Sequence, residues 1–169
     1  SFFGRVNMSM YDKILLTATM RADGSSKFGT NNKYGYFPSV ALGYRISEED
    51  FIPDTFDDLK IRLGWGQTGN QEFPSGASQE QYSITRDGLT RTQFDNPDLR
   101  WETARKQNLG LNVGVFNNRI SFSADFWNEY RWDMLIAADQ REVPPVTGVP
   151  ANSAANLGEA SSRGMELEI

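Results

Sequence analysis

The sequence predicts an all-β protein whose antiparallel strands form a transmembrane β-barrel. Three observations predict this class. Apolar and polar residues alternate through successive segments of about ten residues. Short connections alternate with long polar ones, so one rim carries short periplasmic turns and the other long extracellular loops. Aromatic residues gather near the ends of the expected strands, where an interfacial girdle belongs.

Composition excludes several other classes of protein. The chain has 169 residues, a formal net charge of −5, and neither Cys nor His. The missing Cys and His remove zinc sites built from those ligands, Ser-His-Asp and Cys-His catalysis, and disulfide bonds. The acidic balance provides no basic surface for nucleic acid, and no apolar run is long enough for a transmembrane helix. We therefore expect no enzyme, no cofactor, no metal site and no nucleic-acid partner.

The first three crossings are expected to start at Ser1, Ile14 and Phe37. Their apolar positions recur at every second residue: Phe2, Val6, Met8 and Met10; Ile14, Leu16, Ala18 and Met20; Val40, Leu42, Tyr44 and Ile46. The alternate positions are polar or small, and they include Arg5, Arg21 and Arg45. Because successive side chains of a strand point to opposite faces, the apolar set is expected to face lipid and the polar set the lumen.

Four more crossings are expected, starting at Leu59, Glu102, Ile120 and Leu157. Segments 102–115 and 120–135 exceed the usual strand length of about 5–6 residues in soluble proteins. Lys60 and Arg62 fall on the lumen phase. The residues expected to face lipid at the middle of their strands are Phe2, Leu16, Leu42, Leu63, Leu111 and Phe122.

The connections also alternate in length. Tight turns are expected at 11–13 and 116–119, and long loops at 24–36, 68–99 and 133–157. In the second loop, "QYSITRDG" predicts an extracellular ribbon. The intermediate connection, 47–58, begins like a capped helical turn with Ser47 as N-cap. Its carboxylates are interpreted as a solvated rim rather than an acid–base site: Glu48, Glu49, Asp50, Asp54, Asp57 and Asp58.

One glycine pattern suggests a different function at first sight. Gly64, Gly66 and Gly69 spell G-x-G-x-x-G after a β-like run, as in dinucleotide-binding folds. That motif needs a helix to follow, whereas Asn70 and Pro74 begin a run of turn residues. We therefore place Gly64 and Gly66 on the lumen wall, where glycine permits close approach, and interpret Gly69–Asn70 as a turn at the loop entry.

A soluble β-fold also alternates and stays open as an alternative. The barrel is favoured by the long strands, by a polar face rich in Gly, Ser, Thr, Asn and Arg, and by the girdle residues. The residues assigned to the girdle are Phe37, Tyr44, Trp65, Trp101, Tyr130 and Trp132.

Several segments resemble one family closely. They include "FGRVNMSMYDKILLTATMRADGSSKFG", "FPSVALGYRISEEDF", "LKIRLGWGQTGN", "NPDLRWETARKQNLGLNVGVFNNRISFSADFWN" and "NLGEASSRGMELEI". In consecutive order they look like the C-terminal barrel of SusC/RagA-type TonB-dependent outer-membrane transporters, which are nutrient receptors of Bacteroides-like bacteria. The resemblance spans almost the whole chain.

The resemblance implies a barrel of about 22 strands in a much longer chain. This sequence would supply about seven to eight of them, so we expect 1–169 to be a partial receptor barrel without its plug domain and signal peptide. A small standalone outer-membrane barrel, or an adhesin-like structural or binding protein, is the alternative. The flanking coding sequence would separate the two.

The same resemblance implies the partners. The whole receptor would import an oligosaccharide or a peptide, with a SusD-like surface lipoprotein as lid and TonB acting through the missing N-terminal part. Loop aromatics suit such ligands by stacking, and Tyr34, Tyr36 and Trp101 are the candidates for ligand or lid contact. Loop–loop packing and anchoring in the girdle are the competing roles for them. Calcium binding by Asp95, Asp98 and Glu102 is the less favoured alternative, because these residues do not have the spacing of an EF-hand.

Overall fold

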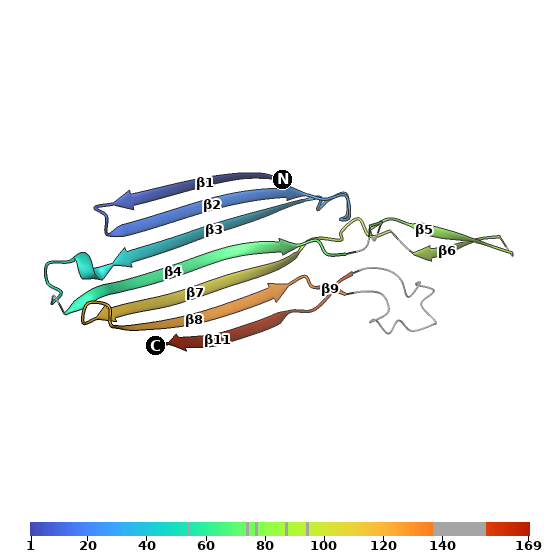
Figure 1. Cartoon of the computed structure of the whole chain (residues 1–169). Helices are drawn as coiled ribbons and strands as arrows, with labels where there is room; N and C mark the ends of the chain where they lie inside the picture. The colour runs from blue at the N-terminus through green and yellow to red at the C-terminus, as the bar shows by residue number, and fades with distance from the viewer. Residues whose placement is uncertain (54, 74, 77, 87, 94, 137–154) are drawn as a thin grey trace.

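Long antiparallel strands form one sheet in the computed structural model (Figure 1), which describes residues 1–53, 55–73, 75–76, 78–86, 88–93, 95–136 and 155–169. Within these residues the main sheet has seven strands in the order β1-β2-β3-β4-β7-β8-β11. Their bounds are Phe2–Met10, Ile14–Gly24, Tyr34–Arg45, Phe56–Asn70, Glu102–Val115, Ile120–Trp132 and Ala160–Glu168. The seven predicted strands are confirmed.

The register confirms that the sheet has two chemically different faces, because residues paired across neighbouring strands point to the same side. One row is apolar from β2 to β11: Leu16, Leu42, Leu63, Leu109, Phe126 and Met165. A row of the opposite phase is polar or small: Thr19, Ser39, Gly66, Lys106, Glu129 and Ser162. We call these sides the apolar face and the polar face.

The apolar face is broadly exposed in this structure. Phe2 keeps 80% of its surface accessible, Leu63 46% and Met165 56%. Contiguous exposed apolar surface of this kind indicates contact with a membrane or a partner. No helix among the described residues is long and apolar enough to cross a membrane.

The two ends of the sheet differ as predicted (Figure 1). At one end β1 and β2 are joined by a tight turn in which Tyr11 and Asp12 both have positive φ, 52° and 55°, and Lys13 N donates to Met10 O at 3.1 Å. Positive φ at both central residues matches a type I′ hairpin turn. The tight turn at 116–119 joins β7 and β8 at the same end. The long connections leave the opposite end.

Two long connections contain short strands of their own. The predicted ribbon is confirmed as the hairpin of β5, Gln81–Thr85, and β6, Gly88–Gln93. In the third long connection β9, Leu135–Ile136, pairs with β10, Ala155–Asn156. The rest of that connection, 137–154, lies outside the described residues.

Several predicted boundaries were wrong because pairing continues beyond the regular alternation. β3 begins at Tyr34 rather than Phe37, since 34–36 pair with 22–24 of β2. β4 runs from Phe56 to Asn70, and its last two residues pair with Thr103 and Glu102. Gly69–Asn70 is therefore strand rather than turn. The last two main strands also differ, because β8 ends at Trp132 and β11 begins at Ala160.

The capped helical turn predicted at Ser47 was also wrong. The connection holds a short 3₁₀ helix, η1, Ile46–Glu48, whose preceding residue is Arg45 and which has no side-chain cap. Arg45 still pairs with Lys60, and its N–H donates to Lys13 O at 2.8 Å. The turn therefore starts directly from the strand, one residue before Ser47 could cap it.

Candidate functional site

The polar face carries an ion pair that reaches across a whole strand. Arg62 on β4, Gly110 on β7 and Asp125 on β8 occupy one cross-strand row. Arg62 Nη2 donates to Asp125 Oδ2 at 2.8 Å and Oδ1 at 3.1 Å, and Arg62 Nε donates to Asn112 Oδ1 at 3.0 Å. Three neighbouring strands are thereby tied together on the polar face.

Gly110 makes this contact sterically feasible. A Cβ built at Gly110 would lie 2.6 Å from Asp125 Oδ1 and 2.7 Å from Arg62 Nη2. Real Cβ atoms essentially never approach so closely, so any side chain here displaces the pair. The alternation predicted the polar phase of Arg62, but it gave no register and so could not pair Arg62 with Asp125.

Further ion pairs lie nearer the long loops. Lys106 Nζ is 3.1 Å from Glu129 Oε2, Arg131 also contacts Glu129, and Arg131 Nη1 is 3.7 Å from Glu102 Oε1. On β2, Arg21 Nε is 2.7 Å from Asp23 Oδ2. Each pair is partly solvated and contributes about 0.2–1 kcal/mol. The polar face is therefore charged, but much of its charge is locally compensated.

At the loop end of the sheet a small aromatic core forms. Phe28, Phe37, Leu99 and Trp101 are almost fully buried, with exposed fractions of 2%, 5%, 0% and 6%. The Trp101 ring lies 4.6 Å from that of Phe28 and 5.5 Å from that of Phe37, between centroids. We call these four residues the loop-end core. It corrects the assignment of Phe37 and Trp101 to a lipid-facing girdle.

Backbone and side-chain hydrogen bonds clamp two long connections together beside this core. Gly29 N donates to Leu99 O at 2.9 Å, Asn31 Nδ2 donates to Asp98 Oδ1 at 3.1 Å, and Asn32 Nδ2 donates to Asp98 O at 3.1 Å. A Cβ on Gly29 would lie 1.9 Å from Pro97 O, so the close approach depends on glycine. Segments far apart in the sequence thus act as one loop surface.

The structure does not bring the predicted ligand-contact residues together. Tyr34 and Tyr36 lie on β3, not in a loop, and are 66% and 62% exposed. Gly35 between them faces the other way, because its Cβ would lie 3.2 Å from Trp101. Trp101 is therefore buried on the side opposite the two tyrosines. The roles of all three in ligand or lid contact stay predictions.

Glu49 is one of the carboxylates assigned to the rim, and it bonds to Lys13 and Tyr44 rather than to another carboxylate. Glu49 Oε2 is 3.0 Å from Lys13 Nζ, and Tyr44 OH donates to Glu49 Oε1 at 2.8 Å. These hydrogen bonds hold the pKa of Glu49 below its usual value, and the bond from Lys13 to Glu49 raises the pKa of Lys13. In the described part of the chain, no three carboxylates converge as a metal site would require. Asp54 lies outside the described residues.

Comparison with known proteins identifies the family. A model of the family "TonB dependent receptor-like, beta-barrel" matches residues 1–169. The chain is 36% identical to the TonB-dependent receptor SusC of Bacteroides thetaiotaomicron and 37% identical to the TonB-dependent receptor P3 of Formosa agariphila. Each match covers 100% of this chain and 18% of the relative, so the chain spans less than a fifth of their length.

Solved structures agree in fold. The RagAB peptide importer in its open-open state superposes with a TM-score of 0.86 at 32% identity, covering 98% of this chain and 18% of that one. The siderophore receptor PirA of Pseudomonas aeruginosa covers 98% of this chain and 29% of that one, with a TM-score of 0.62 at 16% identity. The likeness to PirA shows the fold alone.

Proposed function

The chain belongs to the β-barrel family of TonB-dependent receptors, and from this premise we propose that it forms one section of the wall of a nutrient importer. Members of this family are outer-membrane β-barrels of Gram-negative bacteria, and they act as receptors and transporters rather than enzymes. The apolar face of the sheet then meets lipid, and the polar face lines the lumen.

We propose that the whole receptor imports an oligosaccharide or a peptide. The observation that carries this proposal is the match of the complete seven-stranded sheet to the RagAB peptide importer, at 32% identity and a TM-score of 0.86. The relative named SusC is matched along the entire chain as well. A SusD-like surface lipoprotein would cover the long-loop end, and TonB would supply energy through an N-terminal plug.

The clamped loops support a binding role at that end. The loop-end core fixes the segments around Gly29 and Leu99 before any ligand arrives, which lowers the entropy lost on binding. Tyr34 and Tyr36 remain the proposed contacts for the ligand or the lid, because both are exposed near the start of β3. Direct contact by Trp101 would require the loop-end core to open.

A standalone barrel or adhesin gains no specific support. Among the described strands β1 and β11 form opposite edges of an open sheet, and they do not pair with each other. An open edge in lipid leaves backbone groups without partners. The sheet therefore fits one section of a wider barrel.

Uptake by the intact receptor tests the proposal. In a strain lacking the native gene, cells carrying the receptor should accumulate fluorescent oligosaccharides or peptides, and deletion of TonB should abolish the uptake. Equal accumulation with and without TonB would contradict energy-coupled import.

Two double variants then distinguish residues that contact the ligand or the lid from residues that only hold the loops in place. Replacing Tyr34 and Tyr36 by Ala should reduce uptake or lipoprotein co-purification at normal surface abundance. Replacing Asn31 and Asn32 by Ala removes two clamp hydrogen bonds and should loosen the loop surface, measured as faster proteolysis of the loops. If the tyrosine variant retains full uptake and co-purification, this end of β3 is only part of the girdle.

A further inference from the structure

One row on the apolar face changes character halfway across the sheet. It is apolar on β1 to β4 and polar on β7, β8 and β11. Its members in strand order are Val6, Ala18, Val40, Trp65, Gln107, Asn128 and Arg163. Polar groups thus lie on the side of the sheet that meets lipid.

The stagger of the strands explains the change. Val6 lies four residues before the end of β1 at Met10, whereas Gln107 lies eight residues before the end of β7 at Val115. The row therefore rises away from the tight turns as it crosses the sheet. With about 3.3 Å per residue and a tilt of about 35–45°, eight residues reach about 20 Å, near the edge of an apolar band about 25 Å tall. The polar half of the row thus lies in the part of the apolar band nearest the long loops, within reach of the lipid head groups.

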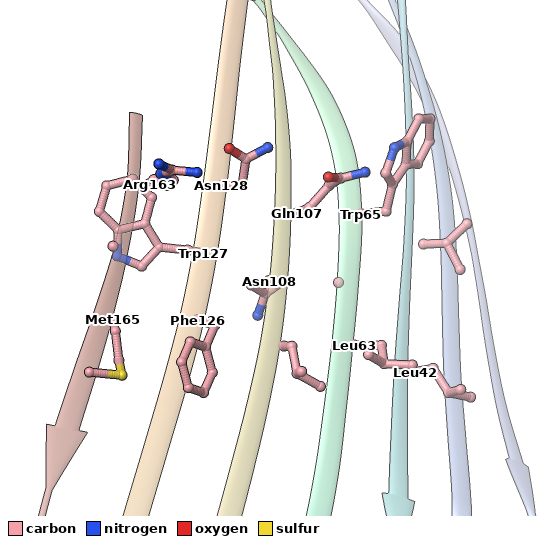
Figure 2. Close-up of a pocket in the computed structure, with 14 residues that line it drawn as sticks. Leu42, Leu63, Trp65, Gln107, Asn108, Phe126, Trp127, Asn128, Arg163 and Met165 are labelled. Carbon is pink, nitrogen blue, oxygen red and sulfur yellow. The ribbon is translucent and has the colours of Figure 1, made fainter. Parts of the chain in front are cut away.

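A groove lies next to Gln107, Asn128 and Arg163, on their side towards the tight turns. It is open, has a volume of ≈ 940 Å³, and is lined on the apolar face by Leu63, Leu109, Phe126 and Met165. Figure 2 shows Arg163, Asn128 and Gln107 in line above Met165, Phe126 and Leu63. Polar side chains thus border an apolar groove. This arrangement fits a lipid, which has a polar head group and apolar chains.

The three polar residues have unused hydrogen-bonding capacity. Arg163, Asn128 and Gln107 are all exposed, and within the described ranges none of their side chains makes a hydrogen bond or an ion pair to another residue. By contrast, Arg62 and Arg131 on the polar face pair with carboxylates. A guanidinium with two carboxamides at its side suits a phosphate group, since all three side chains donate hydrogen bonds.

We propose that this groove holds a lipid of the leaflet next to the long loops, with an anionic phosphate-bearing head group at Arg163, Asn128 and Gln107. Its acyl chains lie along Leu109 and Phe126. The charge of Arg163 selects an anionic over a zwitterionic head group, because no acidic partner among the described residues neutralises it. This lipid contact is separate from the import function and does not depend on the nutrient.

Native mass spectrometry of the intact receptor tests this. The purified receptor is titrated with phosphatidylglycerol and with phosphatidylcholine carrying the same acyl chains. The wild type should bind phosphatidylglycerol more tightly, and Arg163→Gln should weaken that binding about five-fold while leaving phosphatidylcholine unchanged. Arg5→Gln is the matched control, because Arg5 is an exposed arginine on the opposite, polar face.

A further variant and a competitor distinguish a lipid seated in the groove from general attraction between charges. Asn128→Arg adds a cation beside Arg163 and should tighten phosphatidylglycerol binding. Excess inorganic phosphate should not displace the lipid, because it lacks the acyl chains that fill the groove. The proposal is overturned if Arg163→Gln binds both lipids like the wild type, if Arg5→Gln loses as much affinity, or if inorganic phosphate removes the preference.

Discussion

Replacing Gly110 by Ala should destabilise the receptor, and the additional replacement of Asp125 by Ala should remove most of that cost. The new methyl carbon would lie 2.6 Å from Asp125 Oδ1 and 2.7 Å from Arg62 Nη2. Contacts between heavy atoms are favourable near about 3.5 Å, so both side-chain ends must move, each by roughly 0.8–0.9 Å. Moving them weakens a partly exposed ion pair worth about 0.2–1 kcal/mol and adds a little packing strain, for a total of about 1 kcal/mol.

The measurement is a double-mutant cycle on the intact receptor. Urea unfolding in detergent micelles is followed by loss of the heat-modifiable band for wild type, Gly110→Ala, Asp125→Ala and the double variant. In the Asp125→Ala background the nearest carboxylate is gone and Arg62 can turn aside. There the added methyl should cost little or become stabilising, because Ala loses less backbone entropy than Gly on folding.

Gly4→Ala provides the matched control. Gly4 also lies within a strand, yet a Cβ built there meets nothing within 4 Å. It should leave the unfolding midpoint unchanged or raise it slightly. The reasoning fails if Gly110→Ala behaves like Gly4→Ala, or if its cost is the same with and without Asp125.

Three other outcomes follow from the structure. Arginine at Leu111, on the apolar face, should cost roughly 2–4 kcal/mol of folding free energy, whereas arginine at Ser123, on the polar face, should cost far less; equal costs would contradict the assignment of the apolar face to lipid. Because the pKa of Glu49 is lowered from 4.5, its stabilising pair with Lys13 is complete above that value and is lost as the pH falls through the lowered pKa. The difference in thermal midpoint between wild type and Glu49→Gln should therefore vanish in strong acid, and a difference that persists there would contradict this. An isolated polypeptide of 1–169 should not refold into a heat-modifiable, protease-resistant barrel, because both edges of its sheet lack partners in lipid.

The alternation of residues was sufficient to predict the strands and their faces. It holds from Leu109 to Val115, for example, and the structure bounds that strand at 102–115, as predicted. It failed at strand ends, because there the partner strand decides the boundary. Tyr34 and Tyr36 belong to β3 since β2 extends to Gly24, and Gly69 belongs to β4 since Thr103 pairs with it.

Contacts that depend on register could not be predicted from the pattern. Trp101 at the start of a strand fits a girdle and a buried core equally well in sequence, and only the folding of 25–33 against 95–101 buries it. The link between Arg62 and Asp125 likewise joins residues on strands that are not direct neighbours. One-dimensional alternation indicates which face a residue occupies, but it does not indicate which residues meet there.

Several strand glycines leave space that side chains of neighbouring strands fill. On the polar face a Cβ on Gly64 would lie 1.9 Å from Asn108 Oδ1, and one on Gly164 would lie 2.7 Å from Trp127. At Gly110 the same is true of Arg62 and Asp125. The apolar face has both cases, because Gly4 has open space whereas a Cβ on Gly24 would lie 2.9 Å from Tyr34. The particular neighbour that the register brings to a position therefore decides whether glycine is required there, and the face alone does not.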